Sequence, residues 1–468
     1  MSDTPRRITL AEWDARYAEL RAAGLTEPDY GGPLRRHVAE GDVRLLKLRM
    51  DNSAASLRLW NFLLSEEDRL RGAVAAGKQL VGTMKDLGTV PVMVYSFRDL
   101  VAFYPDGAWW LPCLLEGGGE LMAIADSLGI DDSYCPVRAM LGAFVNKKRF
   151  PIPGLLTCSV GATCDDFSAI AQRVESLGFP VFWWEIPHRR PPEPGEPAVE
   201  LPGGFHAPAE QVAFVKSELA RVLAALETYA GERLSQEQLA TGIARTNQAR
   251  MALGALRQIA YTAEPCPMPA LEMLVVEMLA IHFCSDHNET LQVLAELLEE
   301  VRRRVRARVG VLEADAVRVF WVNPVADLRA MNLLEDTGGR ICGSDYLFCH
   351  ALDHIPTDLP PLEALARMAL ADPMAGSPAE RARRIGADVR RFGAEAVVIS
   401  RIPGASHCAM EGTVIADVLR TETPVPVVQI EVPPVTDSVE PTLRTRIEAL
   451  VESVREARGR SSLGKEVG

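Results

Sequence analysis

The chain has 468 residues, more than a single hydrophobic core supports, so two or three domains are expected. Its net charge of −13 and the lack of a basic stripe argue against nucleic acid and anionic membranes as partners. The N-terminus lacks a secretory signal and no apolar run is long enough to span a bilayer, so we expect a soluble, cytoplasmic protein.

In the first 190 residues, the hydrophobic pattern predicts helices that are followed by alternating strands and helices. An amphipathic helix is expected over about Leu10 to Arg21, and a long helical region over Leu57 to Leu87, ended by Gly88. The apolar, β-branched run from Val90 to Tyr95 predicts a short strand. Further expected elements are a helix over Leu114–Leu128, a strand ending at Leu155–Thr157, a helix over Asp165–Leu177 and a strand at Val181–Trp184.

The remainder predicts a crossing, a helical block and a second alternation. Seven prolines and three glycines between Pro187 and Pro208 exclude a helix or a central strand there. Helical periodicity then runs to about Arg308, with Ser235 and Gln238 spaced as a capping box. Strands are expected at Val317–Val322, Arg340–Cys342, Ala396–Ser400 and Val427–Val432, with a closing helix over Leu443–Val454.

This order of elements predicts an α/β protein. We expect two doubly wound parallel-sheet domains, of the Rossmann or flavodoxin-like type, with an added helical domain. The expected divisions are an N-terminal helical segment over 1–75, a first α/β domain over 76–190, a Pro-rich crossing and helical domain over 191–312, and a second α/β domain over 313–468.

Three of the nine cysteines share one local context. Cys135 precedes a proline and an apolar helical run, Cys164 precedes two aspartates and a helix, and Cys408 opens a helix after a strand and loop. A helix N-terminus lowers the pKa of a thiol and tolerates an anionic cluster. An odd number of widely spaced cysteines also favours metal ligation, redox chemistry or burial over a disulfide framework.

The loops that carry these cysteines are expected at the carboxyl ends of parallel strands, where α/β proteins form ligand sites. Two such domains facing each other bring Cys135 and Cys164 from one domain, and Cys408 from the other, to a single metal centre. Soft thiolates select iron–sulfur clusters or zinc. Three thiolates would leave one position of the centre open to a substrate.

Six segments carry a resemblance to a known family. In chain order they are Gly77-Lys-Gln-Leu-Val-Gly82, Tyr134-Cys-Pro-Val-Arg-Ala-Met-Leu-Gly142, Leu155-Leu-Thr-Cys-Ser-Val-Gly-Ala-Thr-Cys-Asp-Asp166, Pro180-Val-Phe-Trp-Trp-Glu-Ile-Pro187, Ser406-His-Cys-Ala-Met-Glu411 and Arg444-Thr-Arg-Ile-Glu-Ala-Leu450. Together they resemble the larger, iron–sulfur-carrying subunit of the 2-hydroxyacyl-CoA dehydratase and benzoyl-CoA reductase family. The resemblance covers most of the chain from about residue 75 onward.

The resemblance implies a lyase or oxidoreductase subunit of anaerobic metabolism. Cys135, Cys164 and Cys408 would hold an oxygen-sensitive [4Fe-4S] cluster, and a second homologous iron–sulfur subunit would complete a heterodimer. A separate ATP-hydrolysing activator would supply one low-potential electron. The electron would pass to an acyl-CoA thioester, whose ketyl-type radical loses a β-placed hydroxyl or, in the aromatic branch, undergoes ring reduction. The chain has no GxxxxGK[ST] motif, in agreement with a separate ATPase.

Other interpretations stay open. Cys158 is additional to the minimal pattern and would be a further ligand in a homodimeric double-cubane reductase of small molecules; a non-catalytic scaffold or electron-transfer partner is the third alternative. Cys113, Cys266 and Cys284 are expected in the core, whereas Cys342 and Cys349 follow a strand near the expected cleft. His350 and His354 have the i, i+4 spacing of a metal pair, but no acid partner or third ligand is evident. No proton-transfer residue is assigned.

Overall fold

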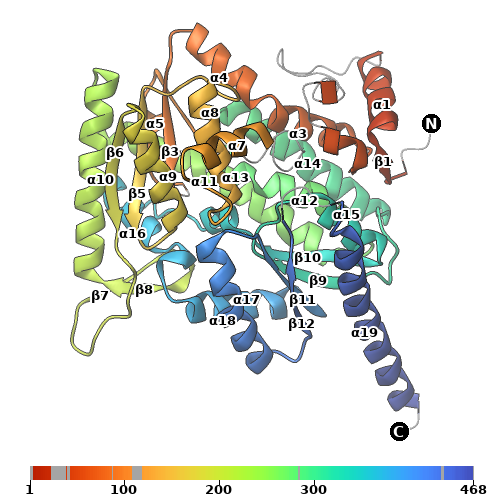
Figure 1. Cartoon of the computed structure of the whole chain (residues 1–468). Coiled ribbons are helices and arrows are strands. Elements are labelled where there is room, and N and C mark those ends of the chain that lie inside the picture. Colours follow the sequence, from red (N-terminus) through yellow and green to blue (C-terminus); the bar gives the residue numbers. More distant parts are fainter. Residues whose placement is uncertain are drawn as a thin grey trace.

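The computed structural model describes residues 4–22, 38–39, 43–86, 88–107, 119–282, 285–433 and 437–466. Within these ranges, none of the helices combines the length and the apolar character needed to cross a membrane. Two four-stranded parallel sheets and the helices around them form the body of the molecule, which confirms the predicted α/β class (Figure 1).

The N-terminal segment is mainly helical and packs beside a small antiparallel ribbon. Its elements are β1 (Arg7–Thr9), α1 (Leu10–Ala22), η1 (Val43–Lys47), β2 (Arg49–Asp51), α3 (Ala54–Leu64) and α4 (Glu66–Ala75). The Ser53 side chain accepts a hydrogen bond from the Ser56 amide at 3.2 Å and so caps α3. The predicted opening helix is confirmed with nearly the expected bounds.

The first sheet has the strand order β4-β3-β5-β6, with all strands parallel. Its elements are β3 (Gln79–Met84), α5 (Val90–Ser96), β4 (Leu100–Phe103), α7 (Gly119–Ser127), η2 (Pro136–Arg138), α8 (Ala139–Asn146), β5 (Leu155–Gly161), α9 (Asp165–Ser176) and β6 (Val181–Ile186). The second strand in the chain, β4, therefore lies beside the first, and the third lies on the first strand's other side.

Two predictions are wrong at the start of this sheet. The region expected to be one helical segment over Leu57–Leu87 forms two helices, α3 and α4, and the second of them ends at Ala75. Gln79–Met84 is instead strand β3, which lies between β4 and β5. The strand expected over Val90–Tyr95 is helix α5, because the Asp86 carboxylate accepts a hydrogen bond from the Thr89 amide at 3.2 Å and from the Val90 amide at 2.6 Å. Capping and burial outweigh the strand preference of these valines.

A Pro-rich crossing and a set of long helices follow. The elements are β7 (Ala198–Glu200), η3 (Pro202–Gly204), β8 (His206–Pro208), α10 (Ala209–Ala230), α11 (Gln236–Thr262), α12 (Ala270–Glu277), α13 (Leu279–His282) and α14 (His287–Ala307). The crossing forms the two-stranded antiparallel ribbon β7–β8 and the short helical turn η3 between its strands. The Ser235–Gln238 capping box at the start of α11 is present as predicted.

The second sheet has the strand order β10-β9-β11-β12 and is also all parallel. Its elements are β9 (Val317–Val322), α15 (Arg329–Asp336), β10 (Gly339–Asp345), η4 (Leu347–Leu352), α16 (Pro361–Leu370), η5 (Pro373–Ala375), α17 (Pro378–Arg391), β11 (Ala396–Arg401), α18 (Ser406–Glu422), β12 (Val427–Glu431) and α19 (Glu440–Glu466). All four strands are at the predicted positions. The domain divisions at 75, 190 and 312 stay predictions.

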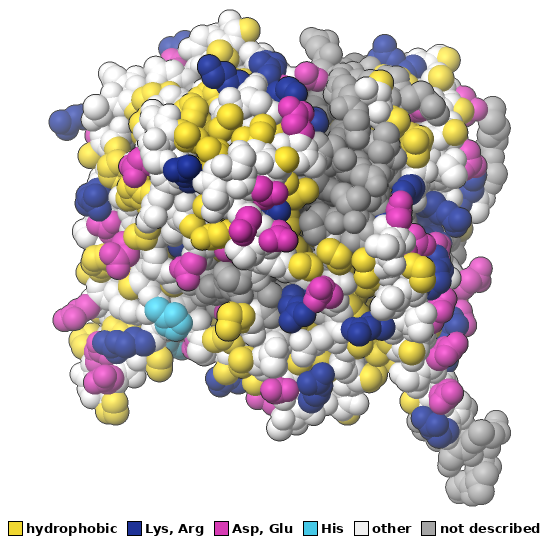
Figure 2. All heavy atoms as spheres, in the orientation of Figure 1, with side chains coloured by type: hydrophobic (Ala, Val, Ile, Leu, Met, Phe, Trp, Pro, Cys, Tyr) yellow, Lys and Arg dark blue, Asp and Glu magenta, His cyan; other side chains and the backbone are white. Residues whose placement is uncertain are grey.

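The two sheets therefore share one topology. In each, the first strand (β3 or β9) lies between the second strand (β4 or β10) and the third (β5 or β11). The second and third strands thus lie on opposite sides of the first strand, which makes the first strand the switch point of the sheet. Ligands of open α/β sheets bind at the carboxyl ends of the strands at such a switch point. Buried apolar side chains from both sheets and the helices between them belong to one continuous core. On the face in Figure 2, acidic and basic side chains are interspersed.

Candidate metal site

A cavity of about 150 Å³ lies at the switch points of both sheets. From the first sheet, Lys85 follows β3 and Cys164 follows β5; from the second, Pro324 follows β9 and Ala405 follows β11. These four residues line the same cavity. The structure thus brings the two carboxyl edges together, as the strand–helix alternation predicted.

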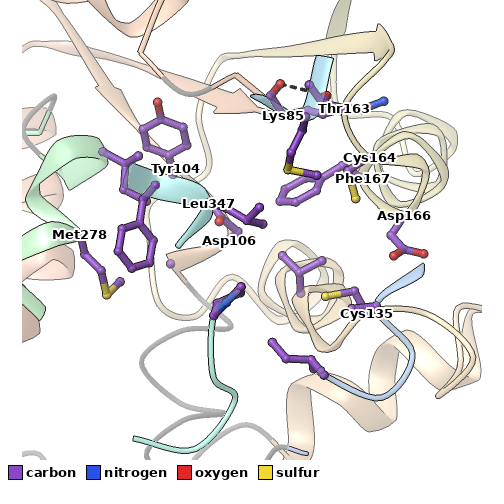
Figure 3. Close-up of a pocket in the computed structure, with 18 of the residues that line it drawn as sticks. Lys85, Tyr104, Asp106, Cys135, Thr163, Cys164, Asp166, Phe167, Met278 and Leu347 are labelled. Atoms are coloured by element: carbon purple, nitrogen blue, oxygen red, sulfur yellow. Dashed lines mark hydrogen bonds between the residues drawn. The ribbon is translucent and has the colours of Figure 1, made fainter. Parts of the chain in front are cut away.

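Cys135 and Cys164 both line this cavity, and Figure 3 shows their side chains on its wall. Cys135 immediately precedes η2, whose first residue is Pro136, and Cys164 is the N-cap residue of α9. Gly161 ends β5 with φ of 102°, and a Cβ at this position would meet the Ile186 carbonyl oxygen at 2.2 Å. The turn that leads to Cys164 therefore requires a glycine.

Cys408 lies in the first turn of α18, close behind the cavity-lining Ala405. The backbone position agrees with the prediction that this cysteine opens a helix. Its side chain, and that of His407, lie outside what the structure describes. Among the described side chains, no group of three or more His, Cys, Asp or Glu has metal-ligand geometry. That Cys408 shares one metal centre with Cys135 and Cys164 therefore stays a prediction.

The other described cysteines differ from this pair in burial. Cys158, Cys266, Cys342 and Cys349 are buried, whereas Cys135 and Cys164 are partly exposed. None of the four buried cysteines lines the cavity. Cys158 points into the core from β5, and Cys266 is in the core as predicted. Cys113 and Cys284, also expected in the core, lie outside the described residues.

The predicted lowering of thiol pKa by a helix N-terminus is wrong for Cys164. Burial raises the pKa of this thiol to about 11, although a hydrogen bond from the Phe167 amide and the charge of Lys85 act in the opposite direction. Burial likewise raises the pKa of Cys158 to about 12. Desolvation disfavours an isolated thiolate here more than the helix start favours it.

Lys85 is an unusual cation at the edge of the cavity. It adopts a left-handed backbone conformation, with φ of 61°, which costs energy for a residue with a side chain. Its carbonyl accepts a hydrogen bond from Ser159 at 2.8 Å, and its ammonium donates to the Ser168 hydroxyl at 3.0 Å. Among the described residues no carboxylate pairs with it. Burial lowers the pKa of Lys85.

Apolar side chains complete most of the cavity wall. They come from η2, α9, α13 and η4 and from the residues that directly follow β4, α12 and β11, and include Tyr104, Val137, Phe167, Met278, Ile281, Leu347, Phe348 and Ile402. Such a lining excludes water and strengthens any electrostatic interaction inside the cavity.

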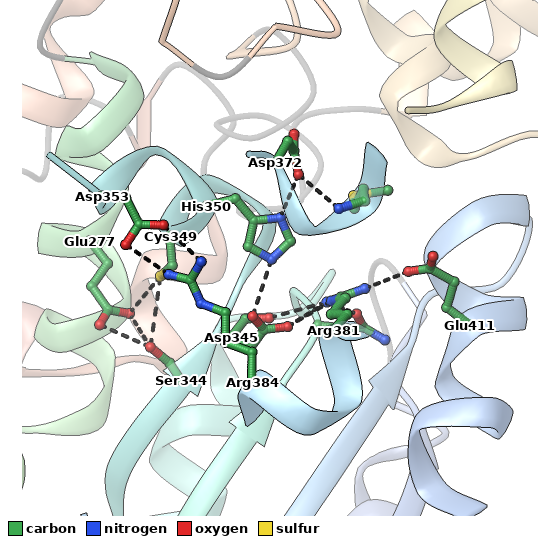
Figure 4. A network of polar contacts seen from close by, with 12 residues as sticks. Glu277, Ser344, Asp345, Cys349, His350, Asp353, Asp372, Arg381, Arg384 and Glu411 are labelled. Atoms are coloured by element: carbon green, nitrogen blue, oxygen red, sulfur yellow. Dashed lines mark hydrogen bonds and ion pairs between the residues drawn. The ribbon is translucent and has the colours of Figure 1, made fainter. Parts of the chain in front are cut away.

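A buried polar network, which no sequence pattern indicated, lies behind the second-sheet wall. The His350 ring lies between Asp345 and Asp372, each at 3.1 Å from one ring nitrogen (Figure 4). Arg381, which has no exposed surface, binds Asp345 at 2.6 Å and Glu411 at 2.7 Å. The sequence makes no acid partner of His350 evident, because both acids come from other elements of the chain.

The comparisons with known proteins agree with this architecture. No curated protein matches the chain. The family described as 2-hydroxyglutaryl-CoA dehydratase, D-component, matches residues 90–454. This range includes all three predicted ligand cysteines and every strand of the two four-stranded sheets except β3. The chain therefore belongs to the 2-hydroxyglutaryl-CoA dehydratase D-component family.

Proposed function

We propose that this chain is the iron–sulfur subunit of a 2-hydroxyacyl-CoA dehydratase-type enzyme, with a [4Fe-4S] cluster held by Cys135, Cys164 and Cys408. The observation that carries the proposal is that the described cysteines fall into two groups, one that lines the cavity and one that is buried elsewhere. The two described cysteines that are partly exposed line one cavity, and the loop before Cys408 lines it too. Thiolates at a water-excluding site are the donors that iron–sulfur clusters require.

When bound, the cluster would supply a single low-potential electron to a CoA thioester. The residues of the chain have separate tasks. The apolar wall from Phe167, Met278 and Ile281 excludes water from the reacting thioester. Lys85 offsets negative charge close to Cys164, because it contributes a buried ammonium that forms no direct ion pair with a described carboxylate. The electron donor would be a separate ATP-hydrolysing activator, and a second homologous subunit would complete the heterodimer.

Dehydration and ring reduction both start from a CoA thioester, so the two reactions are distinguished by which thioester the enzyme converts, a 2-hydroxyacyl-CoA or an aromatic acyl-CoA. The family description names a dehydratase component, which favours dehydration. The double-cubane alternative gains no support from Cys158, which points into the core. We therefore place dehydration of a 2-hydroxyacyl-CoA first.

The test is an iron and sulfide count on protein prepared without oxygen, for the wild type and for Cys135→Ala, Cys164→Ala and Cys408→Ala. We expect about four irons and four sulfides per chain in the wild type and their loss in each variant. Cys342→Ala, which removes a buried thiol outside the cavity, is the matched control and should keep the iron. A folded, iron-free wild type contradicts the proposal. About eight irons, lost also in Cys158→Ala, supports the double-cubane alternative instead.

A further inference from the structure

Asp372 is the carboxylate of the buried network that reaches the cavity. Its Oδ1 accepts hydrogen bonds from His350 at 3.1 Å and from the Met374 amide at 2.9 Å. Its Oδ2 takes no hydrogen bond from any described residue, and 13 % of the side chain is exposed. Asp372 also lines the cavity. One of its oxygens is thus held by the protein, while the other accepts no hydrogen bond from a described residue.

His350 determines how Asp372 is held. The imidazole is buried between Asp372 and Asp345, and Arg381 binds Asp345 from behind. Arg381 pairs with the carboxylates of Asp345 and Glu411, and the buried Arg189, which donates to the Asp372 carbonyl at 3.0 Å, is a second cation beside Asp372. A positive charge on the imidazole adds to these two cations and lies between the carboxylates of Asp345 and Asp372. Burial would lower the pKa of His350, but the two flanking carboxylates outweigh burial and raise it.

The same pair of charges keeps Asp372 ionised. Burial would raise the pKa of Asp372, but the hydrogen bond and the charge of His350 outweigh burial and leave this pKa below its ordinary value. On the other side, Lys85 and Asp86 face His350 and Asp372 across a space of about 10 Å³. That volume holds at most about one water molecule. Asp372 is thus a carboxylate with one free oxygen in an otherwise water-poor cavity.

Building on the proposed dehydratase function, we propose that Asp372 moves the substrate proton and that His350 positions Asp372 for this task. The Oδ2 atom takes a proton from the carbon next to the one that bears the hydroxyl, and gives it to the departing hydroxide. The C–H and C–O bonds break, a C=C bond and one water form, and the carboxylate is regenerated. Over a turnover the C–H electron pair becomes the new π bond and the C–O pair leaves with the hydroxide, so no net oxidant or reductant is consumed.

Chemistry of this kind needs a base within reach of the substrate. Proton transfer by a positioned side chain accounts for about 10²–10⁴-fold of an enzymatic rate. In the cavity, the hydrogen bonds to Oδ1 fix the carboxylate, so that Oδ2 is presented without loss of rotamer freedom at the moment of reaction.

The experiment uses the holoenzyme with its partner subunit and activator, and a 2-hydroxyacyl-CoA substrate. For Asp372→Asn we expect kcat to fall about 10²–10⁴-fold, with KM and iron content unchanged, and for Asp372→Glu a partial recovery. Asp353→Asn is the matched control, because Asp353 pairs with Arg384 beside the network but does not line the cavity. It should keep the wild-type kcat.

A pH profile separates positioning from structural support. His350→Gln keeps a hydrogen-bond donor beside Asp372 but removes the positive charge. Since that charge holds the pKa of Asp372 down, its loss raises this pKa, and the acid limb of the kcat profile should move to higher pH. The other charged groups that face the pair are unchanged in this variant: Asp345, Arg381, Glu411, Lys85, Asp86 and Arg189.

The outcomes are distinguishable. A wild type that binds 2-hydroxyacyl-CoA and dehydrates none overturns the proposed function, and this inference with it. If the wild type is active and Asp372→Asn stays within a few-fold of its rate, the proton-transfer role of Asp372 is overturned while the proposed function stands. If the acid limb of the kcat profile does not move in His350→Gln, the positioning role of His350 is overturned. If Asp372→Asn fails to fold, as judged by its melting curve, Asp372→Glu and His350→Gln still decide.

Discussion

Charged side chains behave differently in this protein according to what surrounds them. Arg381 and Arg383 are two residues apart on α17, yet Arg381 is completely buried between carboxylates and Arg383 is exposed. In the same way His350 is buried and His354 is exposed, because η4 ends at Leu352 and the i, i+4 spacing does not place the two rings on one face. Identical residue types at helical spacing thus have unrelated roles.

We expect Arg381→Met to destabilise the protein strongly. The substitution leaves the Asp345 and Glu411 carboxylates buried without their cation, which costs about 3–5 kcal/mol for a broken buried pair. A lowered urea midpoint would show the loss. Arg383→Met, on the exposed face of the same helix, should leave the midpoint nearly unchanged. Equal midpoints for the two variants would contradict a structural role for the network.

Element identity around β3 depended on contacts that no local pattern reveals. Gln79–Met84 continues an apolar helical pattern, but Gly77 ends the preceding helix with φ of 83° and the segment then pairs with strands on both sides. Val90–Tyr95 is β-branched and apolar, but the Asp86 cap and complete burial make it helical. Elements with long, clear periodicity, such as α10, α14 and α17, have no such competing interactions and match their sequence pattern.

The packing of α7 against α8 gives an element-scale prediction. A Cβ at Gly142 on α8 would lie 2.3 Å from the Leu121 carbonyl oxygen of α7, so Gly142→Ala must push the two helices apart. Overpacking of this kind costs about 1–3 kcal/mol, and α8 follows directly from the Cys135 segment. Thermal unfolding and iron content should both show the change.

Gly254 offers the control for that substitution. It lies in the interior of α11, is exposed, and a methyl group added to its Cα would meet no atom within 4 Å. Gly254→Ala should therefore stabilise the protein by about 0.5–1 kcal/mol through helix propensity. A stabilising Gly142→Ala would show that α7 and α8 adjust without strain.

At the scale of the whole molecule, α11 connects the two sheets. The buried Arg250 on this helix donates to the Gly88 carbonyl, which follows β3, at 3.1 Å and to the Asp353 carbonyl, which follows β10 and η4, at 2.6 Å. Asn247 on the same helix exchanges two hydrogen bonds with the Ile355 backbone. These contacts set how the two switch points face each other, and therefore the shape of the cavity between them.

Arg250→Met should lower stability and loosen the cavity. The buried Gly88 carbonyl loses its donor, at about 1–3 kcal/mol, and the partly buried Asp353 carbonyl loses a hydrogen bond as well, so the loops after β3 and β10 lose a common anchor. We expect a lower melting temperature and reduced iron loading. Arg245→Met, at an exposed position of the same helix, should retain both properties. Full iron loading in Arg250→Met would mean that other contacts hold the two edges in place.

By itself the sequence determined the α/β class, all four strands of the second sheet, the long helices and the three cysteines at helix starts, because hydrophobic periodicity and proline or capping signals are local. Tertiary structure alone decided three features: the secondary structure of residues 79–96, the burial of Cys158, Cys342 and Cys349, whose roles the sequence left open, and the His350 network. Those features depend on burial and on partners far apart in the chain. Asp345, His350, Asp372 and Arg381 meet only when β10, η4, η5 and α17 pack together, so no spacing in the sequence announces them.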